Sequence, residues 1–83
     1  MFDEIDIIEA HKFCAHHREQ LEQSEKCGCF YCTMIFEPKE INFWIDSNDT
    51  AICPYCAIDS VIGDHSGYPI TKEFLSAMKK RWF

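Results

Sequence analysis

The chain has 83 residues, which is enough for one small domain and leaves no room for a second. Its composition is globular, with 47% hydrophobic residues, and no window approaches the roughly 18 apolar residues that a membrane span needs. The formal net charge of −6 repels phosphate backbones and so argues against nucleic-acid binding.

The cellular compartment decides whether six cysteines indicate metal binding or disulfides, and the N-terminus indicates the compartment. Residues 1–6 are acidic and lack the basic and apolar regions of a signal peptide, so we expect a cytoplasmic protein. In that reducing environment six cysteines favour metal binding over disulfides. A chain this short builds a thin core and often needs a bound metal or disulfides to stabilise it.

Residues 4–24 are predicted to form one helix. A mainly apolar stripe recurs there at three- and four-residue steps, through Ile7, Ala10, Cys14, His17 and Leu21. The stripe could form a dimer seam, but no heptad pattern is sustained over several repeats. We therefore expect it to pack on the rest of the domain.

Two cysteine pairs between residues 27 and 63 form the strongest motif. Cys29 and Cys32, then Cys53 and Cys56, read C-x2-C-x20-C-x2-C, which is the spacing of a four-thiolate zinc site. Each pair would form a tight turn that points two sulfurs at one ion. We predict a single structural Zn²⁺ bound by these four cysteines, with no open position for water.

Other side chains could replace a ligand or bind a second ion. Cys27 could take the place of Cys29 in a longer knuckle, and Cys14 with His17 forms an i,i+3 pair. The simpler interpretation is that Cys27 is a knuckle residue, Cys14 a buried small side chain and His17 a histidine at the core edge.

The long insert predicts a β-hairpin. Residues 41–46 alternate apolar and polar side chains, residues 47–49 are turn formers, and residues 50–53 form the returning strand. Pro54 and Gly63 then predict a short helix, since proline favours the first helical position and glycine the position after the end.

Residues 71–82 are predicted to form the last helix, with Thr71 as its N-cap. Lys79, Lys80 and Arg81 complement the helix dipole in the last turn and form a local basic cluster. The two flanking helices should pack around the centre of the domain through Phe13, Leu21, Phe74, Met78 and Trp82.

A knuckle, a hairpin and a helix that carries the second ligand pair together resemble a treble-clef zinc finger. A plain zinc ribbon would instead place both pairs on strand–loop knuckles. The expected fold is therefore α+β: a single zinc-binding domain over residues 1–83, with a treble-clef-like module at 27–63 between helices at 4–24 and 71–82.

A second resemblance is to a family of small bacterial cytoplasmic proteins without an assigned activity. It is carried by Cys27-Gly-Cys-Phe-Tyr-Cys32 and by the run from Cys53-Pro-Tyr-Cys56 to Ile58-Asp-Ser-Val-Ile-Gly63. This resemblance implies a compact intracellular zinc protein and supplies no catalytic residue.

We expect a non-enzymatic module that binds a protein partner. One alternative is a nucleic-acid-binding zinc finger that uses the basic C-terminal helix. The other is a treble-clef hydrolase, which would need Asp59, Asp64 and His65 to converge, although the hairpin lacks the histidine of HNH-type nucleases.

Six residues are the candidate partner or ligand surface. They lie at the first knuckle tip and in the loop before the last helix: Phe30, Tyr31, Asp64, His65, Ser66 and Tyr68. The structural alternative is that Tyr68 fills the core and Asp64 accepts a backbone N–H.

Overall fold

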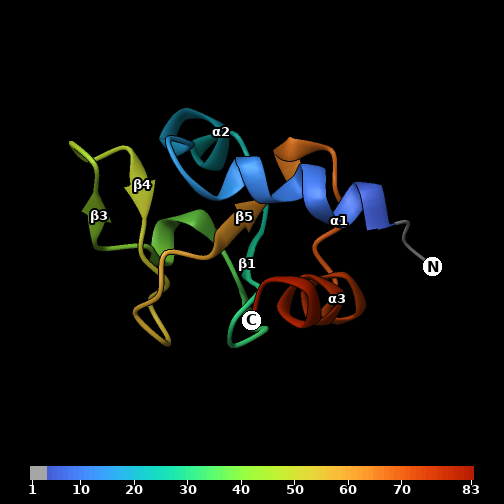
Figure 1. The fold of residues 1–83 in the computed structure, drawn as a ribbon. Coiled ribbons are helices and arrows are strands. Elements are labelled where there is room, and N and C mark those ends of the chain that lie inside the picture. The colour runs from blue at the N-terminus through green and yellow to red at the C-terminus, as the bar shows by residue number, and fades with distance from the viewer. Residues whose placement is uncertain (1–3) are drawn as a thin grey trace.

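A computed structural model describes residues 4–83, and it confirms a small α+β fold (Figure 1). The elements in chain order, with 3-10 helices labelled η, are α1 Glu4–Ala10, η1 His11–Cys14, α2 Arg18–Glu22, β1 Cys27–Cys29, β2 Ile35–Phe36, η2 Pro38–Glu40, β3 Trp44–Ile45, β4 Thr50–Ala51, β5 Val61–Gly63, η3 Asp64–Ser66 and α3 Lys72–Trp82. None of the helices between residues 4 and 83 combines the length and apolar character needed to cross a bilayer.

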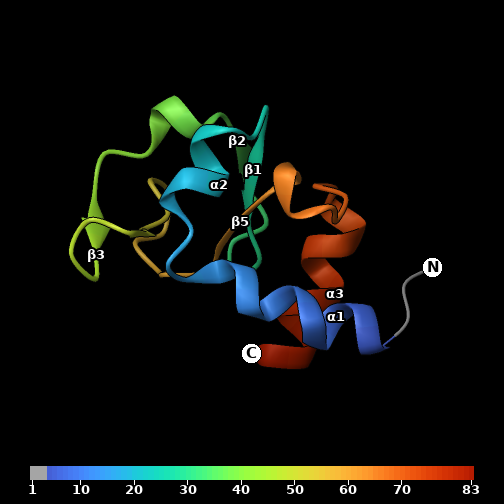
Figure 2. The same ribbon diagram turned by 90° about the horizontal axis from the view of Figure 1, so that it is seen from above.

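A three-stranded antiparallel sheet, in the order β2-β1-β5, separates two hydrophobic cores. Figure 2 shows β1 and β5 lying between α2 and α3. Because side chains alternate along a strand, Cys27, Cys29 and Val61 belong to the core with Leu21 of α2. Ile62 belongs to the opposite core, which α1 and α3 cover.

Two glycines allow the helices to approach this sheet. A Cβ atom at Gly28 would lie 2.6 Å from Cδ1 of Leu75 in α3. A Cβ atom at Gly63 would collide with Ser24, which follows α2. Side chains at either position would therefore push a helix off the sheet.

The prediction of one continuous helix over residues 4–24 is wrong. The chain breaks after Cys14, with φ 49° at His16, and resumes at Arg18. The backbone N–H of His16 donates to the Thr50 hydroxyl, and that of His17 to the Asp49 carbonyl, each at 2.8 Å. These bonds to the hairpin replace intrahelical ones, and the break lets the apolar stripe serve both cores.

The predicted hairpin is confirmed in shorter form as β3 and β4. Residues 46–48 form its turn, with φ values of 55°, 60° and 66°. The hairpin is tied to α2 by Arg18, whose guanidinium carbon lies 4.4 Å from the ring centroid of Trp44.

The helix predicted from Pro54 to Gly63 is also wrong. Residues 54–56 form a turn, and Val61–Gly63 is strand β5, which pairs with β1 in antiparallel register. The β-branched residues of β5 fill both faces of the sheet, which a helix could not do. Cys53 and Cys56 thus lie in a loop between β4 and β5, and the helix on which the treble-clef resemblance depended is not formed.

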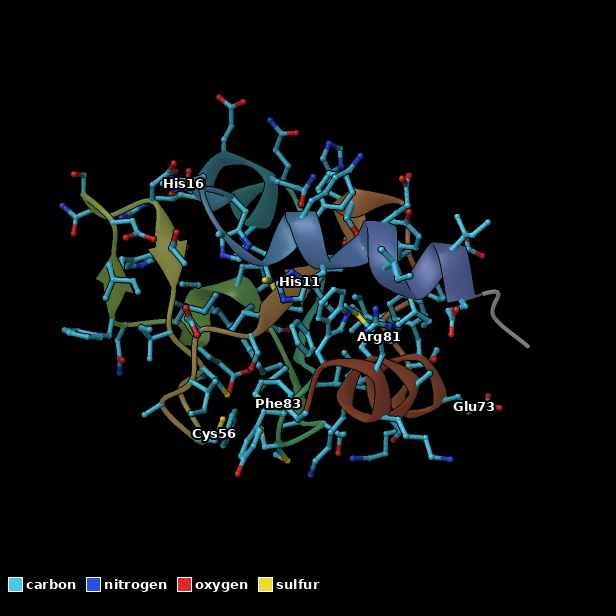
Figure 3. All side chains as sticks on the ribbon, in the orientation of Figure 1. His11, His16, Cys56, Glu73, Arg81 and Phe83 are labelled. Atoms are coloured by element: carbon cyan, nitrogen blue, oxygen red, sulfur yellow. The ribbon has the colours of Figure 1, made fainter. Side chains whose placement is uncertain are left out.

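The last helix is confirmed as α3. The Thr71 hydroxyl caps it by accepting the N–H of Phe74 at 3.1 Å. Phe74 and Met78 are buried, with Phe13 and Trp82 packed against the same core. The ring of His11 lies between η1 and α3, its centroid 4.0 Å from that of Trp82 (Figure 3).

Candidate metal centre

The first cysteine pair lies on a tight loop between β1 and β2. The N–H of Cys29 donates to the Met34 carbonyl at 3.0 Å, and the N–H of Thr33 donates to the Cys29 carbonyl at 2.7 Å. Thr33 adopts a left-handed conformation with φ 63°. The loop therefore turns the chain immediately after Cys32.

The second pair lies on a loop with the same pattern at the same spacing. The N–H of Cys53 donates to the Ile58 carbonyl, and the N–H of Ala57 donates to the Cys53 carbonyl, both at 3.0 Å. Ala57 has φ 65°. The two cysteine pairs therefore lie on two loops that share the same hydrogen-bond pattern and the same left-handed position. A left-handed non-glycine residue costs about 1–2 kcal/mol, which a bound cation would offset.

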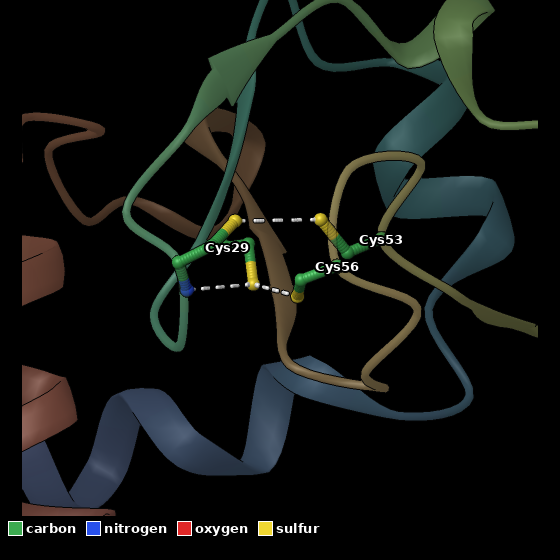
Figure 4. Close-up of side chains that lie close together, drawn as sticks. Cys29, Cys53 and Cys56 are labelled. Carbon is green, nitrogen blue, oxygen red and sulfur yellow. Dashed lines mark hydrogen bonds between the residues drawn. The ribbon is translucent and has the colours of Figure 1, made fainter.

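The four sulfurs of these loops converge, as Figure 4 shows for the facing loops. All four lie within 4.8 Å of one another, with Cys29 and Cys56 at 3.5 Å and Cys32 and Cys53 at 3.7 Å. Sulfurs at about 2.3 Å from one tetrahedral zinc ion would be about 3.8 Å apart. A disulfide needs about 2.05 Å, so the spacing fits a shared ion and not a covalent bond.

Donor groups surround the sulfur of Cys29. Its neighbours are the backbone N–H of Tyr31 at 3.3 Å, that of Cys32 at 3.5 Å and the Ser60 hydroxyl at 3.1 Å. Burial raises the pKa of Cys29, but the Ser60 hydroxyl and these N–H groups outweigh it, so the pKa is lowered overall. These contacts favour the thiolate form of Cys29.

Burial has the larger effect on the pKa of the two thiols on the facing loop, Cys53 and Cys56. Burial raises the pKa of Cys53 to about 11, against the N–H bond that it receives from Tyr55 at 3.4 Å. Burial also raises the pKa of Cys56. Four sulfurs this close become thiolates together only when a cation compensates their charge, so the donor set fits Zn²⁺, whose binding would displace protons.

The other two cysteines lie outside this cluster. Cys27 is buried beside Leu21 and Phe36, and burial raises its pKa to about 12. Burial likewise raises the pKa of Cys14 to about 11. Both are core thiols, in agreement with the simpler interpretation of the sequence.

The alternative second site at Cys14 and His17 is wrong. Nδ1 of His17 donates to the Phe13 carbonyl at 2.6 Å, and Nε2 accepts the N–H of Ala51 at 3.1 Å. Both ring nitrogens are therefore engaged, and His17 fastens the helix break to β4.

The aromatic residues at the first knuckle differ in exposure. Phe30 is only 1% exposed and belongs to the core, so its placement in the candidate partner surface is wrong. Tyr31 is 40% exposed, and its ring meets that of Phe83 edge-on at 4.9 Å.

The loop after β5 makes contacts with the rest of the fold. Asp64 accepts the N–H of Glu25 at 3.0 Å, and the Ser66 hydroxyl donates to the Gly63 carbonyl at 2.7 Å. Tyr68 stacks on Phe74 at 5.6 Å. These are the contacts of the structural alternative, while the His65 side chain is exposed.

The acid–base set of the hydrolase alternative is spread along the chain. Asp59 precedes β5, and Asp64 and His65 follow it. The strand Val61–Gly63 lies between the two aspartates, and among the described residues only the four cysteines, and not Asp59, Asp64 and His65, cluster closely enough to share one ion. The three acid–base residues therefore do not form one metal-binding group.

One group near the metal ligands was missed by sequence reasoning. Ser60 is 2% exposed and contacts Cys29 from the start of β5. A serine four residues after the last cysteine has no distinctive spacing, and the contact exists only because β5 pairs with β1. No family model, curated protein or solved structure matches this chain, so the site is assigned from its own geometry.

Proposed function

We propose that the chain is a zinc-stabilised, non-enzymatic module of the cytoplasm that binds another protein. The observation that carries the proposal is the convergence of four sulfurs on two matched loops. Four thiolates suit zinc in a reducing compartment, and they would leave no ligand position for a catalytic water.

A structural role for the ion is supported by what the knuckles join. They connect β1, β2 and β5, which form the sheet between the two cores. In a chain of 83 residues the free energy of metal binding would then be a large share of the free energy of folding.

The test is metal analysis of the protein purified under reducing conditions. We expect one zinc per chain, and loss of that zinc in Cys32→Ser and Cys56→Ser. Cys14→Ala and Cys27→Ala serve as matched controls and should keep it. A chain that folds without metal, or equal zinc loss in the controls, would contradict the proposal.

Nucleic-acid binding is the second candidate, favoured by the basic residues of α3. The helix carries four of the eight lysines and arginines of the chain: Lys72, Lys79, Lys80 and Arg81. Micromolar binding to generic DNA or RNA that weakens steeply with salt would support this candidate over a protein partner.

A further inference from the structure

An exposed aromatic pair lies beside the first knuckle. Tyr31 and Phe83 are 40% and 60% exposed, and they lie far apart in the sequence, on the first knuckle and just after α3. Their rings meet at 4.9 Å, and the Phe83 ring also lies 5.8 Å from that of buried Phe30. The pair is therefore supported from below by the core while its outer surface is open.

Cationic groups surround this pair. The ammonium of Lys79 lies 5.1 Å from the Tyr31 ring centroid, and that of Lys72 donates to the Thr33 carbonyl at 3.2 Å. We call Tyr31, Lys72, Lys79, Lys80 and Phe83 the knuckle face. It continues into a hollow of about 660 Å³ along α3, and Figure 3 shows Phe83 and Glu73 at opposite ends of that helix.

The charge of α3, which supplies the three lysines of this face, is opposite to that of the rest of the molecule. Helix α3 carries four cations and one anion, a net charge of +3 within a chain of −6, which leaves −9 on the remaining residues. The molecule extends over 32 Å, whereas charges are screened within about 8 Å at physiological salt. A ligand at the knuckle face is therefore attracted mainly by the local positive charge.

From this complementarity we propose that the knuckle face binds a short acidic segment of another protein that carries an aromatic or large aliphatic anchor. The anchor packs on Tyr31 and Phe83, and the flanking carboxylates face Lys72, Lys79 and Lys80. Aromatic side chains that are held in place before binding are the usual centres of such interfaces. This inference rests on the proposed function, because the first knuckle holds Tyr31 in position.

A peptide suits this face better than a nucleic acid does. A nucleic-acid strand that extends past the few cations of the face carries its phosphates over the acidic remainder of the surface. A peptide can confine its carboxylates to the patch. Bases of a single strand would also stack on the two rings, so the acidic remainder of the surface is what disfavours a nucleic acid.

The probe is a displayed library of random 12-residue peptides, selected on the zinc-loaded chain. Selected peptides are then synthesised with a fluorophore and titrated by anisotropy. We expect enrichment of aspartate and glutamate around one apolar residue. Tyr31→Ala, Phe83→Ala and Lys79→Ala should each weaken binding at least fivefold.

Matched controls remove the same groups elsewhere. Phe43 is 61% exposed and lies on the hairpin side, and the Lys39 side chain is 82% exposed. Phe43→Ala and Lys39→Ala should leave the peptide affinity unchanged. Zinc content and thermal unfolding verify that every variant is folded, and a variant that does not fold is replaced by Tyr31→Leu or Phe83→Leu, which should still weaken binding.

Three outcomes would overturn the inference. They are a selection that yields no binders, binders that are insensitive to Phe83→Ala, and tighter binding of a single-stranded dT12 oligonucleotide than of the selected peptides. Any of these with one zinc per folded chain overturns the knuckle face while the zinc module stands. A chain that carries no zinc overturns the proposed function itself.

Discussion

At the scale of single residues, the candidate metal centre includes groups other than the four clustered cysteines. Two backbone N–H groups donate to one sulfur, that of Cys29, and the Ser60 hydroxyl lies 3.1 Å from it. These donors lower the pKa of one thiol against the effect of burial. They therefore favour the thiolate form of Cys29.

Removing the Ser60 hydroxyl should weaken metal binding without removing a ligand. We expect Ser60→Ala to reduce zinc affinity roughly tenfold, because groups that support metal ligands contribute at that scale. The measurement is competition with a chromophoric chelator. Ser66→Ala removes a hydroxyl that bonds to the Gly63 carbonyl and should leave the affinity unchanged. Equal losses in the two variants would contradict the role given to Ser60.

His17 makes the fold sensitive to pH. Its two ring nitrogens are engaged in the neutral form, and burial lowers its pKa below the ordinary value of 6.5, despite the nearby Asp49 carboxylate and the Phe13 carbonyl. Below that value the unfolded chain takes up a proton that the folded chain does not. The stabilisation is therefore complete above about pH 6.5 and declines as the pH falls, by at most about 1.4 kcal/mol per pH unit.

The measurement is chemical unfolding between pH 7.5 and 5.5, with wild type compared with His17→Gln. Acid also displaces the metal, so the difference between the two chains is the relevant quantity. We expect the wild type to lose more stability than the variant over this interval. Parallel pH profiles would contradict the prediction, because they would show that His17 takes up its proton equally readily in the folded and the unfolded chain.

At the scale of elements, the two knuckles explain why the segment after Cys53 is not a helix. Pro54 and Gly63 are helix-boundary signals, but proline also fits a tight turn and glycine also fits a close approach to α2. The left-handed Ala57 decides between them, since it turns the chain back toward β1. Because the residue is alanine and not glycine, the sequence does not indicate a left-handed conformation at position 57.

Replacing Ala57 with glycine distinguishes a helix from the observed turn, because the free energy of unfolding is expected to change differently in the two cases. Within a helix Ala57→Gly would destabilise the chain by about 1 kcal/mol. At φ 65° it relieves strain of about 1–2 kcal/mol and loses about 0.4–1 kcal/mol through the freer unfolded chain. We expect a neutral or stabilising result by denaturant unfolding of the zinc-loaded protein. Ala77→Gly, inside α3, is the control and should destabilise by about 1 kcal/mol.

The same elements show what could be predicted from the sequence. Cysteine spacing identified the four clustered residues, alternation identified the hairpin, and the Thr71 cap identified the start of α3. The break at residues 15–17 could not be predicted, because its hydrogen-bond partners lie more than thirty residues away on the hairpin. The buried position of Phe30 could not be predicted either, since it follows from β1 pairing with β5.

At the scale of the whole molecule, one small sheet connects two cores. One core contains the candidate ligands Cys29 and Cys53, and the other contains residues of α3 and none of the four clustered cysteines. The side chains of the sheet alternate between the two cores. Both cores would therefore lose part of their packing if the two cysteine loops separated and the sheet were disrupted. We therefore expect the domain to fold as one cooperative unit whose stability depends on the ion.

The two tryptophans of the chain report on the two cores separately. Trp44 packs against the core with the ligands, and Trp82 packs against the core under α3. In Trp82→Phe only Trp44 fluoresces, and in Trp44→Phe only Trp82. On titration with a zinc chelator both signals should change at the same chelator concentration, together with the far-ultraviolet circular dichroism. A Trp82 signal that persists after the Trp44 signal is lost would mean that α1 and α3 hold together without the ion, and the ion would then stabilise only one side of the sheet.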